Sequence, residues 1–274
     1  MRLGIDIGGT TISIGTVADM AIREVSTAAS FSKGASLDET AEYLYRLIKE
    51  RINHSVESIG IGVPSIVDTV KGIVYNAANI PSWTEFHIKE YLEEKFGVPV
   101  SVDNDANCYA LGAYRMLGGG DGDVFTGITL GTGVGIGIIS GGKLFRGANT
   151  GAGELGWMPC KGKSLEYWCS KQVFEDSGLD PKVLYEKAKA GDVGAKTFFR
   201  EFGSNMATLL MLTLSAYDPS TVVFGGGIAN CSELFGPVMM ERVGSQFPFP
   251  GSLDRLRIEY FPNHDAAILG AALL

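Results

Sequence analysis

A glycine-rich turn between two strand-like runs occurs twice in this sequence, and this feature constrains the fold most. Residues 3–10 read Leu-Gly-Ile-Asp-Ile-Gly-Gly-Thr, and residues 126–135 read Thr-Gly-Ile-Thr-Leu-Gly-Thr-Gly-Val-Gly. A β-branched run follows each turn, so each segment predicts a β-hairpin. Glycine allows close approach to an anion, and successive N–H donors form a concave site for phosphate oxygens. The recurrence predicts two related halves that hold a polyphosphate such as ATP.

Asp6 lies in the otherwise apolar strand that leads into the first turn. An unpaired carboxylate at such a position is costly, so it needs a partner. One interpretation is an aspartate that caps its own turn. The other is a carboxylate that faces Mg²⁺ on a bound nucleotide. We favour the second, because a second glycine-rich hairpin follows downstream.

Length, charge and composition exclude several classes of protein. With 274 residues, 45% of them hydrophobic, the chain is large enough for two modest lobes around a cleft. A net charge of −8 argues against a general nucleic-acid surface and against an anionic membrane partner. No stretch approaches the roughly 18 uncharged apolar residues of a membrane helix. Only two residues precede the first strand, so we expect no signal peptide, a cytoplasmic location and free thiols.

Strand-like and helix-like segments alternate along the chain, which favours an α/β fold with parallel strands. The first lobe is expected to span residues 1–117 together with a C-terminal segment at 262–274, and the second lobe residues 118–261. Hydrophobic periodicity and capping residues predict the principal helices at 36–52, 83–96, 107–117, 169–178, 192–216, 231–245 and 266–274.

Asp105 has the position of a catalytic residue in such a fold. It follows the strand-like run at 98–102 and begins a helical segment, where α/β sheets place their sites. Phosphoryl transfer to a hydroxyl group needs a base that receives the proton, opposite the γ-phosphate. Asp105 suits that role, and the alternative is a helix cap.

Several short motifs occur in the order seen in the ROK family of sugar kinases: Asp6-Ile-Gly-Gly-Thr10, Asn104-Asp105-Ala-Asn107, Gly131-Thr-Gly-Val-Gly135, Glu154-Leu-Gly156 and Gly225-Gly-Gly-Ile228. The sequence resembles this family over essentially its whole length. The resemblance implies a two-lobed, actin-like (ribonuclease H-like) α/β ATPase fold with a central cleft. It also implies an ATP- and Mg²⁺-dependent kinase that phosphorylates a hydroxyl, at C6, of a hexose such as glucose, mannose or an N-acetylhexosamine. A homodimer or larger homo-oligomer is implied as well.

The same resemblance implies roles for individual residues. Asp105 is implied as the catalytic base, and Asn104 beside it as a sugar ligand. Further sugar ligands are implied at Asn79, Glu154 and Glu166, which the residues alone would present as a turn residue and two solvated carboxylates. Thr11 stands where the family often has lysine. The nucleotide contacts implied in the glycine-rich segments are Gly8, Gly9, Thr10, Thr11, Gly131, Thr132, Gly133, Gly226 and Gly227, with Asp6 toward Mg²⁺.

The segment after Glu154 departs from the family pattern. The family has a histidine followed by three cysteines, which together bind a structural zinc. Here Trp157 replaces the histidine, and Cys160 is the one cysteine kept before Glu166. Stable zinc sites need four nitrogen or sulfur ligands, so we expect no structural zinc, although Cys169 follows. Because the family histidine also touches the sugar, Trp157 is expected either to stack on a sugar face or to fill the space left by the metal.

Other functions remain to be weighed against a kinase. The ROK family includes transcriptional repressors with an N-terminal helix-turn-helix, which we do not expect here because of the early first strand and the acidic charge. A non-catalytic, sugar-sensing regulator is a second alternative, and the presence of Asp105 and of both hairpins argues against it. An ATPase that acts on another acceptor, such as a carboxylate, is a third; the Asn-Asp pair and the two glutamates suit a polyhydroxyl acceptor better.

Overall fold

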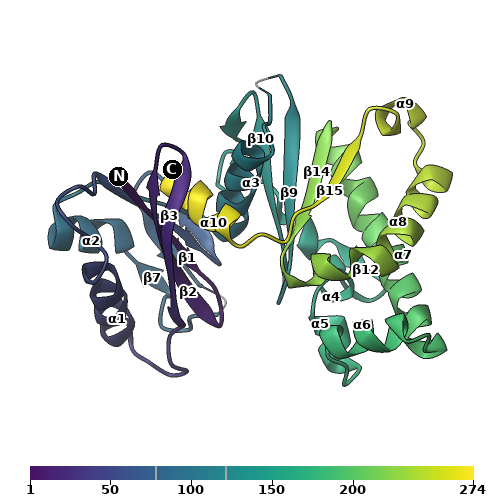
Figure 1. Ribbon diagram of the computed structural model, residues 1–274, viewed down its shortest axis with the longest axis horizontal. Coiled ribbons are helices and arrows are strands. Elements are labelled where there is room, and N and C mark those ends of the chain that lie inside the picture. Colours follow the sequence, from purple (N-terminus) through teal and green to yellow (C-terminus); the bar gives the residue numbers. More distant parts are fainter. Residues whose placement is uncertain (78, 121) are drawn as a thin grey trace. The chain divides into compact units, whose positions relative to one another are not determined.

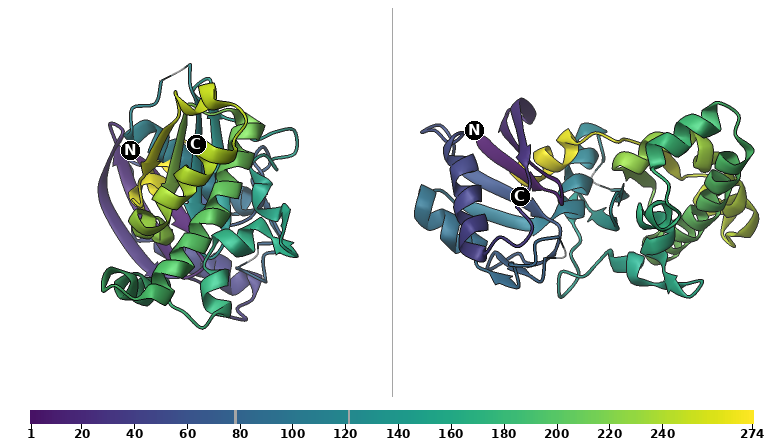
Figure 2. Two further views of the ribbon diagram at one scale, coloured as in Figure 1. Left: turned by 90° about the vertical axis from the view of Figure 1, so that its right-hand side faces the viewer. Right: turned by 90° about the horizontal axis from the view of Figure 1, so that it is seen from below.

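The computed structural model describes residues 1–77, 79–120 and 122–274, which form two compact units. The first unit comprises Met1–Gly119, Leu144–Ala152 and His264–Leu274, and the second comprises Gly120–Lys143 and Gly153–Asn263. Each unit has a five-stranded sheet with helices packed against it (Figures 1 and 2). In the described residues, no helix is both long enough and apolar enough to cross a membrane.

The two five-stranded sheets have the same strand order. In the first unit the order is β3-β2-β1-β4-β8, with β1 at Arg2–Ile7, β2 at Thr11–Ala18, β3 at Ala21–Ala29, β4 at Ser58–Val63 and β8 at Val100–Asn104. In the second it is β11-β10-β9-β14-β15, with β9 at Val124–Leu130, β10 at Val134–Ser140, β11 at Lys143–Leu144, β14 at Thr221–Gly225 and β15 at Arg257–Tyr260. In each sheet the glycine-rich turn joins an antiparallel pair, β1 with β2 or β9 with β10, and two parallel strands follow. In the first sheet β3 also pairs antiparallel with β2. The predicted hairpins and the predicted relation between the halves are confirmed.

The sheet of the first unit is covered on both faces. Alternate residues of β1, such as Leu3 and Ile5, pack in a core with α1 (Leu37–Lys49) and α2 (Ile88–Phe96). The opposite face of β1 and β4 carries α10 (Asp265–Ala272), which also packs on α3 (Asp105–Met116), as Figure 1 shows. A Cβ atom at Gly112 would collide with the carbonyl oxygen of Ala266. Glycine is therefore required for α3 and α10 to approach this closely.

A small sheet at the periphery of the first unit corrects one prediction. It contains β5 (Ile66–Asp68), β6 (Ile73–Tyr75) and β7 (Glu85–Phe86). The helix predicted at 83–96 is wrong at its start, because β7 occupies part of it and α2 begins at Ile88. Trp83 is fully buried, and its indole N–H donates to the hydroxyl oxygen of Thr40 at 2.8 Å. The burial of Trp83 and its bond to Thr40 thus hold this residue outside the helix.

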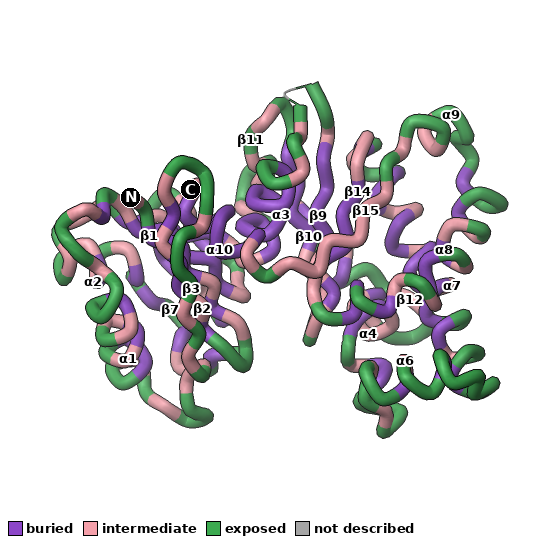
Figure 3. Tube along the Cα trace, in the orientation of Figure 1, coloured by how far each residue is buried: buried purple, intermediate pink, exposed green. Residues whose placement is uncertain are grey.

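Two long helices, α7 (Val193–Tyr217) and α8 (Ser232–Gln246), pack against each other in the second unit, whose core contains many phenylalanines. Figure 3 shows buried residues along β9 and, in the first unit, along α10. The helix predicted at 169–178 is wrong at its start: Ser170 is extended, and the helix within this range begins at Gln172. The remaining elements of this unit are η1 (Glu154–Trp157), β12 (Pro159–Cys160), β13 (Lys163–Ser164), α4 (Leu165–Cys169), α5 (Gln172–Asp176), α6 (Pro181–Lys189), η2 (Gly227–Cys231) and α9 (Pro250–Leu253).

Candidate active site

The first glycine-rich turn lies at one edge of the first sheet, between β1 and β2. The N–H of Gly8 donates to the carbonyl oxygen of Thr11 at 2.8 Å, and the hydroxyl of Ser30 donates to the carbonyl oxygen of Gly8 at 2.8 Å. Gly9, Thr10 and Thr11 are exposed. A Cβ atom at Gly9 would lie 3.3 Å from Cγ of Asn79, so Asn79 flanks the turn. The turn has the exposed backbone that a phosphate group requires.

Asp6 lies at the same edge, at the end of β1. Removal from water raises the pKa of its carboxyl from 3.8 to about 6, while the nearby His264 opposes the rise. The folded protein therefore holds a proton on Asp6 at pH values at which the unfolded chain has lost it. Ionised Asp6 therefore costs the folded protein stability.

We expect Asp6→Asn to stabilise the ligand-free protein. Stability conferred by protonated Asp6 is lost as the pH rises from about 4 through about 6, because the folded carboxyl then ionises in a poorly solvated place. The amide does not ionise, so the free energy of unfolding should rise by about 1–2 kcal/mol at about pH 8 and by less at about pH 5. Urea unfolding at both pH values measures this difference. Equal stability of both proteins at about pH 8 would contradict it.

Asp105 is the first residue of α3, directly after β8. Asn104 caps this helix: its Oδ1 accepts from the N–H groups of Ala106 and Asn107 at 2.9 and 3.3 Å. The Nδ2 of Asn104 donates to the carbonyl oxygen of Ser65 at 3.2 Å. Because Asn104 supplies the cap, the alternative role of Asp105 as the capping residue is not needed.

The parallel strands bring Asp105 to the edge where Asp6 lies. Asp6 on β1 is in register with Gly62 on β4, and Gly62 is in register with Asp103 on β8. Two strand spacings separate Asp6 from Asp103, so their backbones lie roughly 10 Å apart. Asn79 flanks the turn that follows Asp6. The first unit thus gathers its predicted nucleotide turn, its candidate base and two predicted sugar ligands at one sheet edge.

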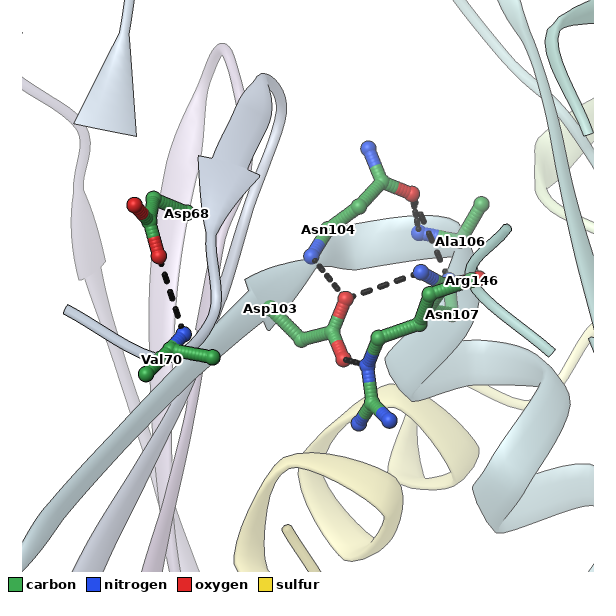
Figure 4. A network of polar contacts seen from close by, with 7 residues as sticks. All are labelled: Asp68, Val70, Asp103, Asn104, Ala106, Asn107 and Arg146. Carbon is green, nitrogen blue, oxygen red and sulfur yellow. Dashed lines mark hydrogen bonds and ion pairs between the residues drawn. The ribbon is translucent and has the colours of Figure 1, made fainter. Parts of the chain in front are cut away.

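A buried ion pair is formed by Asp103, two residues before Asp105, and was not predicted; Figure 4 shows it. Asp103 is 1% exposed, and its Oδ2 accepts from Nε of Arg146 at 2.6 Å. Its Oδ1 accepts from Nδ2 of Asn107 and from the N–H of Asn104, both at 2.8 Å. The carboxylate therefore fixes the residues on both sides of Asp105. The sequence Asp-Asn-Asp at 103–105 shows a second carboxylate next to Asp105. It does not show the cation that pairs with Asp103, because Arg146 lies in a distant segment of the chain.

The second glycine-rich turn has a glutamate bound to it. It lies between β9 and β10, and the N–H of Val134 donates to Oε2 of Glu166 at 3.0 Å. Gln172 lies beside the same carboxylate, with its Nε2 3.4 Å from Oε1. A Cβ atom at Gly133 would lie 2.5 Å from Oε2 of Glu166. The candidate sugar ligand Glu166 thus lies against the candidate phosphate-binding turn. Gln172 was not among the predicted site residues and lies beside this carboxylate.

Glu154 and Trp157 lie together on η1. The indole N–H of Trp157 donates to Oε2 of Glu154 at 3.1 Å. Partial burial raises the pKa of Glu154; the bond from Trp157 opposes this, and the nearby Glu166 adds to the rise. The Trp157 side chain is 74% exposed, so it does not fill a space left by a metal. Stacking of Trp157 on a sugar face stays a prediction.

Gly226 and Gly227 follow β14 at the same edge of the second sheet. Gly226 has a φ of +78°, and a Cβ atom there would collide with the carbonyl oxygen of Leu130 at the end of β9. Glycine is therefore needed at this position. The second unit gathers Gly131–Gly133, Gly226 and Gly227 at its sheet edge, with Glu154, Trp157 and Glu166 near the turn.

The residues of this chain do not fit a structural zinc. In the second unit, the sulfur ligands of the relevant segment are Cys160 and Cys169, and Cys169 is buried. Burial raises the pKa of the Cys169 thiol, which disfavours the thiolate that a metal requires. The three histidines belong to the first unit. Across residues 1–77, 79–120 and 122–274, no group of three or more His, Cys, Asp or Glu side chains is placed to hold a metal.

We expect the purified protein to contain no stoichiometric zinc. Two sulfur ligands leave a tetrahedral site incomplete, so binding would be weak and zinc would be lost during purification. Elemental analysis of protein purified without chelator measures the zinc content. About one zinc per chain would contradict this expectation and would require ligands in addition to Cys160 and Cys169.

Comparison with known proteins assigns the family. Residues 2–170 and 158–274 match the ROK family. The chain belongs to the ROK family. A β-glucoside kinase of Listeria monocytogenes is 31% identical to this ROK protein over 82% of each chain. A glucokinase of Halalkalibacterium halodurans is 29% identical over 99% of this chain and 94% of that protein.

Solved structures agree with this assignment. The crystal structure of a ROK family glucokinase from Streptomyces griseus in complex with glucose and AMPPNP has a TM-score of 0.80 to this ROK protein. The two chains are 28% identical, and the match covers 99% of this chain and 97% of that one. The fold is therefore the actin-like α/β ATPase fold that the sequence resemblance implied.

Proposed function

We propose that this ROK protein is an ATP-dependent sugar kinase that transfers the γ-phosphate of ATP to a hydroxyl, at C6, of a hexose. The observation that carries the proposal is the edge of the first sheet, where Asp105 begins α3 beside Asn104 and shares the edge with the glycine-rich turn. A candidate base and a phosphate-binding turn on one sheet edge are what phosphoryl transfer to a hydroxyl needs.

The proposed roles follow from the chemistry of each group. Asp105 accepts the proton of the attacking hydroxyl, the role of a general base for which a positioned carboxylate is suited. Asn79, Asn104, Glu154 and Glu166 are the proposed ligands of sugar hydroxyls. Trp157 covers an apolar sugar face with its exposed indole. The backbone N–H groups of both turns bind the phosphates of ATP.

Mg²⁺ fits the donors at the first turn. Protein sites for Mg²⁺ with nucleotides use one or two carboxylates together with phosphate oxygens and water. Asp6 supplies such a carboxylate next to the turn. When bound, Mg²⁺ neutralises phosphate charge. Asp6 would hold the ion beside the turn.

The substrate of this kinase is proposed from its relatives. The relative in Listeria monocytogenes is named a β-glucoside kinase, and that in Halalkalibacterium halodurans a glucokinase. Glucose, mannose, N-acetylhexosamines and β-glucosides are therefore the compounds to test. We further propose that the enzyme acts in the cytoplasm, where ATP and free hexoses are available, as a homodimer or larger homo-oligomer.

A coupled assay of ADP release with about a dozen sugars tests the proposed function. Sugar-dependent ADP release with formation of a sugar phosphate is the expected result. Sugar binding without ADP release would instead favour a non-catalytic sugar sensor. ADP release that no sugar accelerates would favour an ATPase with a different acceptor. Sedimentation analysis measures the oligomeric state in the same preparation.

A further inference from the structure

A hairpin connects the two acidic sugar ligands proposed in the second unit. Glu154 lies on η1, directly before the hairpin of β12 and β13, and Glu166 lies on α4, directly after it. The N–H of Leu165 donates to the carbonyl oxygen of Met158 at 2.8 Å, which closes the base of the hairpin. The position of this hairpin therefore determines how Glu154 and Glu166 lie relative to each other.

The turn of the hairpin has an unfavourable backbone at a lysine. Lys161 and Gly162 have φ angles of +47° and +79°. Two positive φ angles in succession are typical of a tight hairpin turn, in which asparagine or glycine is the usual first residue. A lysine with a left-handed backbone costs on the order of 1 kcal/mol. Its side chain must make interactions that offset this cost.

Those interactions fix the tip of the hairpin to the long helix α7. The Nζ of Lys161 donates to Oδ1 of Asn205 at 2.5 Å, and Asn205 is 5% exposed in the middle of α7. The same ammonium lies 5.5 Å from the ring centroid of Trp168 on α4. The indole N–H of Trp168 in turn donates to the carbonyl oxygen of Cys160 at 2.9 Å. One cation thus joins the hairpin, α4 and α7.

We propose that Lys161 is a positioning residue for the sugar site, and that its ammonium fixes the hairpin carrying Glu154 and Glu166 so that this segment needs no metal. This inference rests on the proposed function for its kinetic consequences. The ammonium bound by an amide oxygen and an aromatic face is a charge-assisted contact. It lies on the segment between Trp157 and Glu166 that lacks a complete set of zinc ligands.

Lys161→Met and Lys163→Met form a matched pair of variants. Lys163 is on the same hairpin, but its ammonium lies over the ring of Tyr167 at 3.6 Å and pairs with the half-exposed Asp176 at 3.3 Å. We expect Lys161→Met to raise the KM for the sugar about 10-fold to 100-fold, since small misplacements of substrate-binding groups have effects of that size. The KM for ATP should stay within about twofold, as should every constant of Lys163→Met.

Asn205→Leu supplies an independent test of the same contact. It should raise the sugar KM as Lys161→Met does, and the double variant should be no worse than either single one. Lys161→Arg, which keeps a cation at the tip, should recover most of the loss. Equal effects of Lys161→Met and Lys163→Met, or additive effects of Lys161→Met and Asn205→Leu, would overturn the proposal.

Hydrogen exchange of the amides at 154–169 separates this proposal from the proposed function. Exchange there should rise in Lys161→Met and not in Lys163→Met, with unchanged exchange in β9 and α8. This result does not depend on turnover, so it tests Lys161 even if no sugar is phosphorylated. Unchanged exchange at 154–169 would refute the role of Lys161 and leave the kinase proposal standing. Activity of the wild type with a zinc-selective chelator and excess Mg²⁺ should be unaffected.

Discussion

Asp105→Asn should lower kcat by about 10²–10⁴-fold, the usual contribution of a positioned base. Asparagine has the same shape, and its Oδ1 still accepts from the N–H of Ala106, which Asp105 contacts at 2.9 Å. The variant should therefore fold and bind both substrates, but it has no group that takes the proton from the sugar hydroxyl. Steady-state kinetics with the best sugar, together with calorimetric measurement of sugar binding, distinguishes loss of chemistry from loss of binding.

Asp68→Asn is the control for this experiment. Asp68 is an aspartate of the same unit whose Oδ1 accepts from the N–H of Val70 at 3.1 Å (Figure 4). The same oxygen accepts from the N–H of Lys71 at 2.9 Å. An asparagine oxygen accepts the same bonds, so turnover should stay close to that of the wild type. Asp105 would lose its assigned role if its asparagine variant, correctly folded, turned over as fast as Asp68→Asn.

Arg146→Met should reduce the free energy of unfolding by about 3–5 kcal/mol, because it leaves the buried Asp103 without its cation. Methionine keeps much of the apolar stem but cannot donate to the carboxylate, which lies 2.6 Å from Nε. Turnover should fall as well, since Asp103 also fixes Asn104 and Asn107 around Asp105. Urea unfolding with a fixed m-value, followed by kinetics at a temperature where the variant is folded, measures both effects.

Arg23→Met provides the comparison for an exposed pair. Arg23 binds Asp19 at 3.2 Å, and the two side chains are 53% and 90% exposed. Water and salt screen such a pair, so its loss should change stability by about 0–1 kcal/mol. A similar, small loss in both variants would show that the partner of Asp103 is replaced by water and that the ion pair does not organise the site.

Patterns confined to neighbouring residues predicted the structure well. The two hairpins follow from glycine turns between β-branched runs, and their positions are confirmed. The start of α1 follows from Ser36 and Glu39, which cap the helix reciprocally at 3.2 and 2.8 Å. In each case the interacting groups are a few residues apart, so the sequence contains the whole interaction.

Interactions between distant segments were not predictable in the same way. Arg146 and Asp103 are 43 residues apart, and Val134 and Glu166 are 32 residues apart. No turn rule or periodicity connects such pairs, because their distance depends on how the sheets and helices pack. Trp83 shows the converse: its position in a helix-like pattern is overruled by its burial and its bond to Thr40. The sequence therefore predicted which residues are candidates for the site. It did not predict the side chains that orient those residues.

The close packing of α3 on α10 has a consequence for the order in which the protein matures. The first unit takes its last helix from residues that are translated after the entire second unit. A domain folds as a unit, so the first sheet and α3, which begins with Asp105, lack the packing of α10 until that helix has left the ribosome. The continuous stretch Gly153–Asn263 of the second unit takes no element from the C-terminal segment. The half of the protein that carries the candidate base is therefore completed last during synthesis, and a truncated nascent chain has no finished phosphoryl-transfer edge.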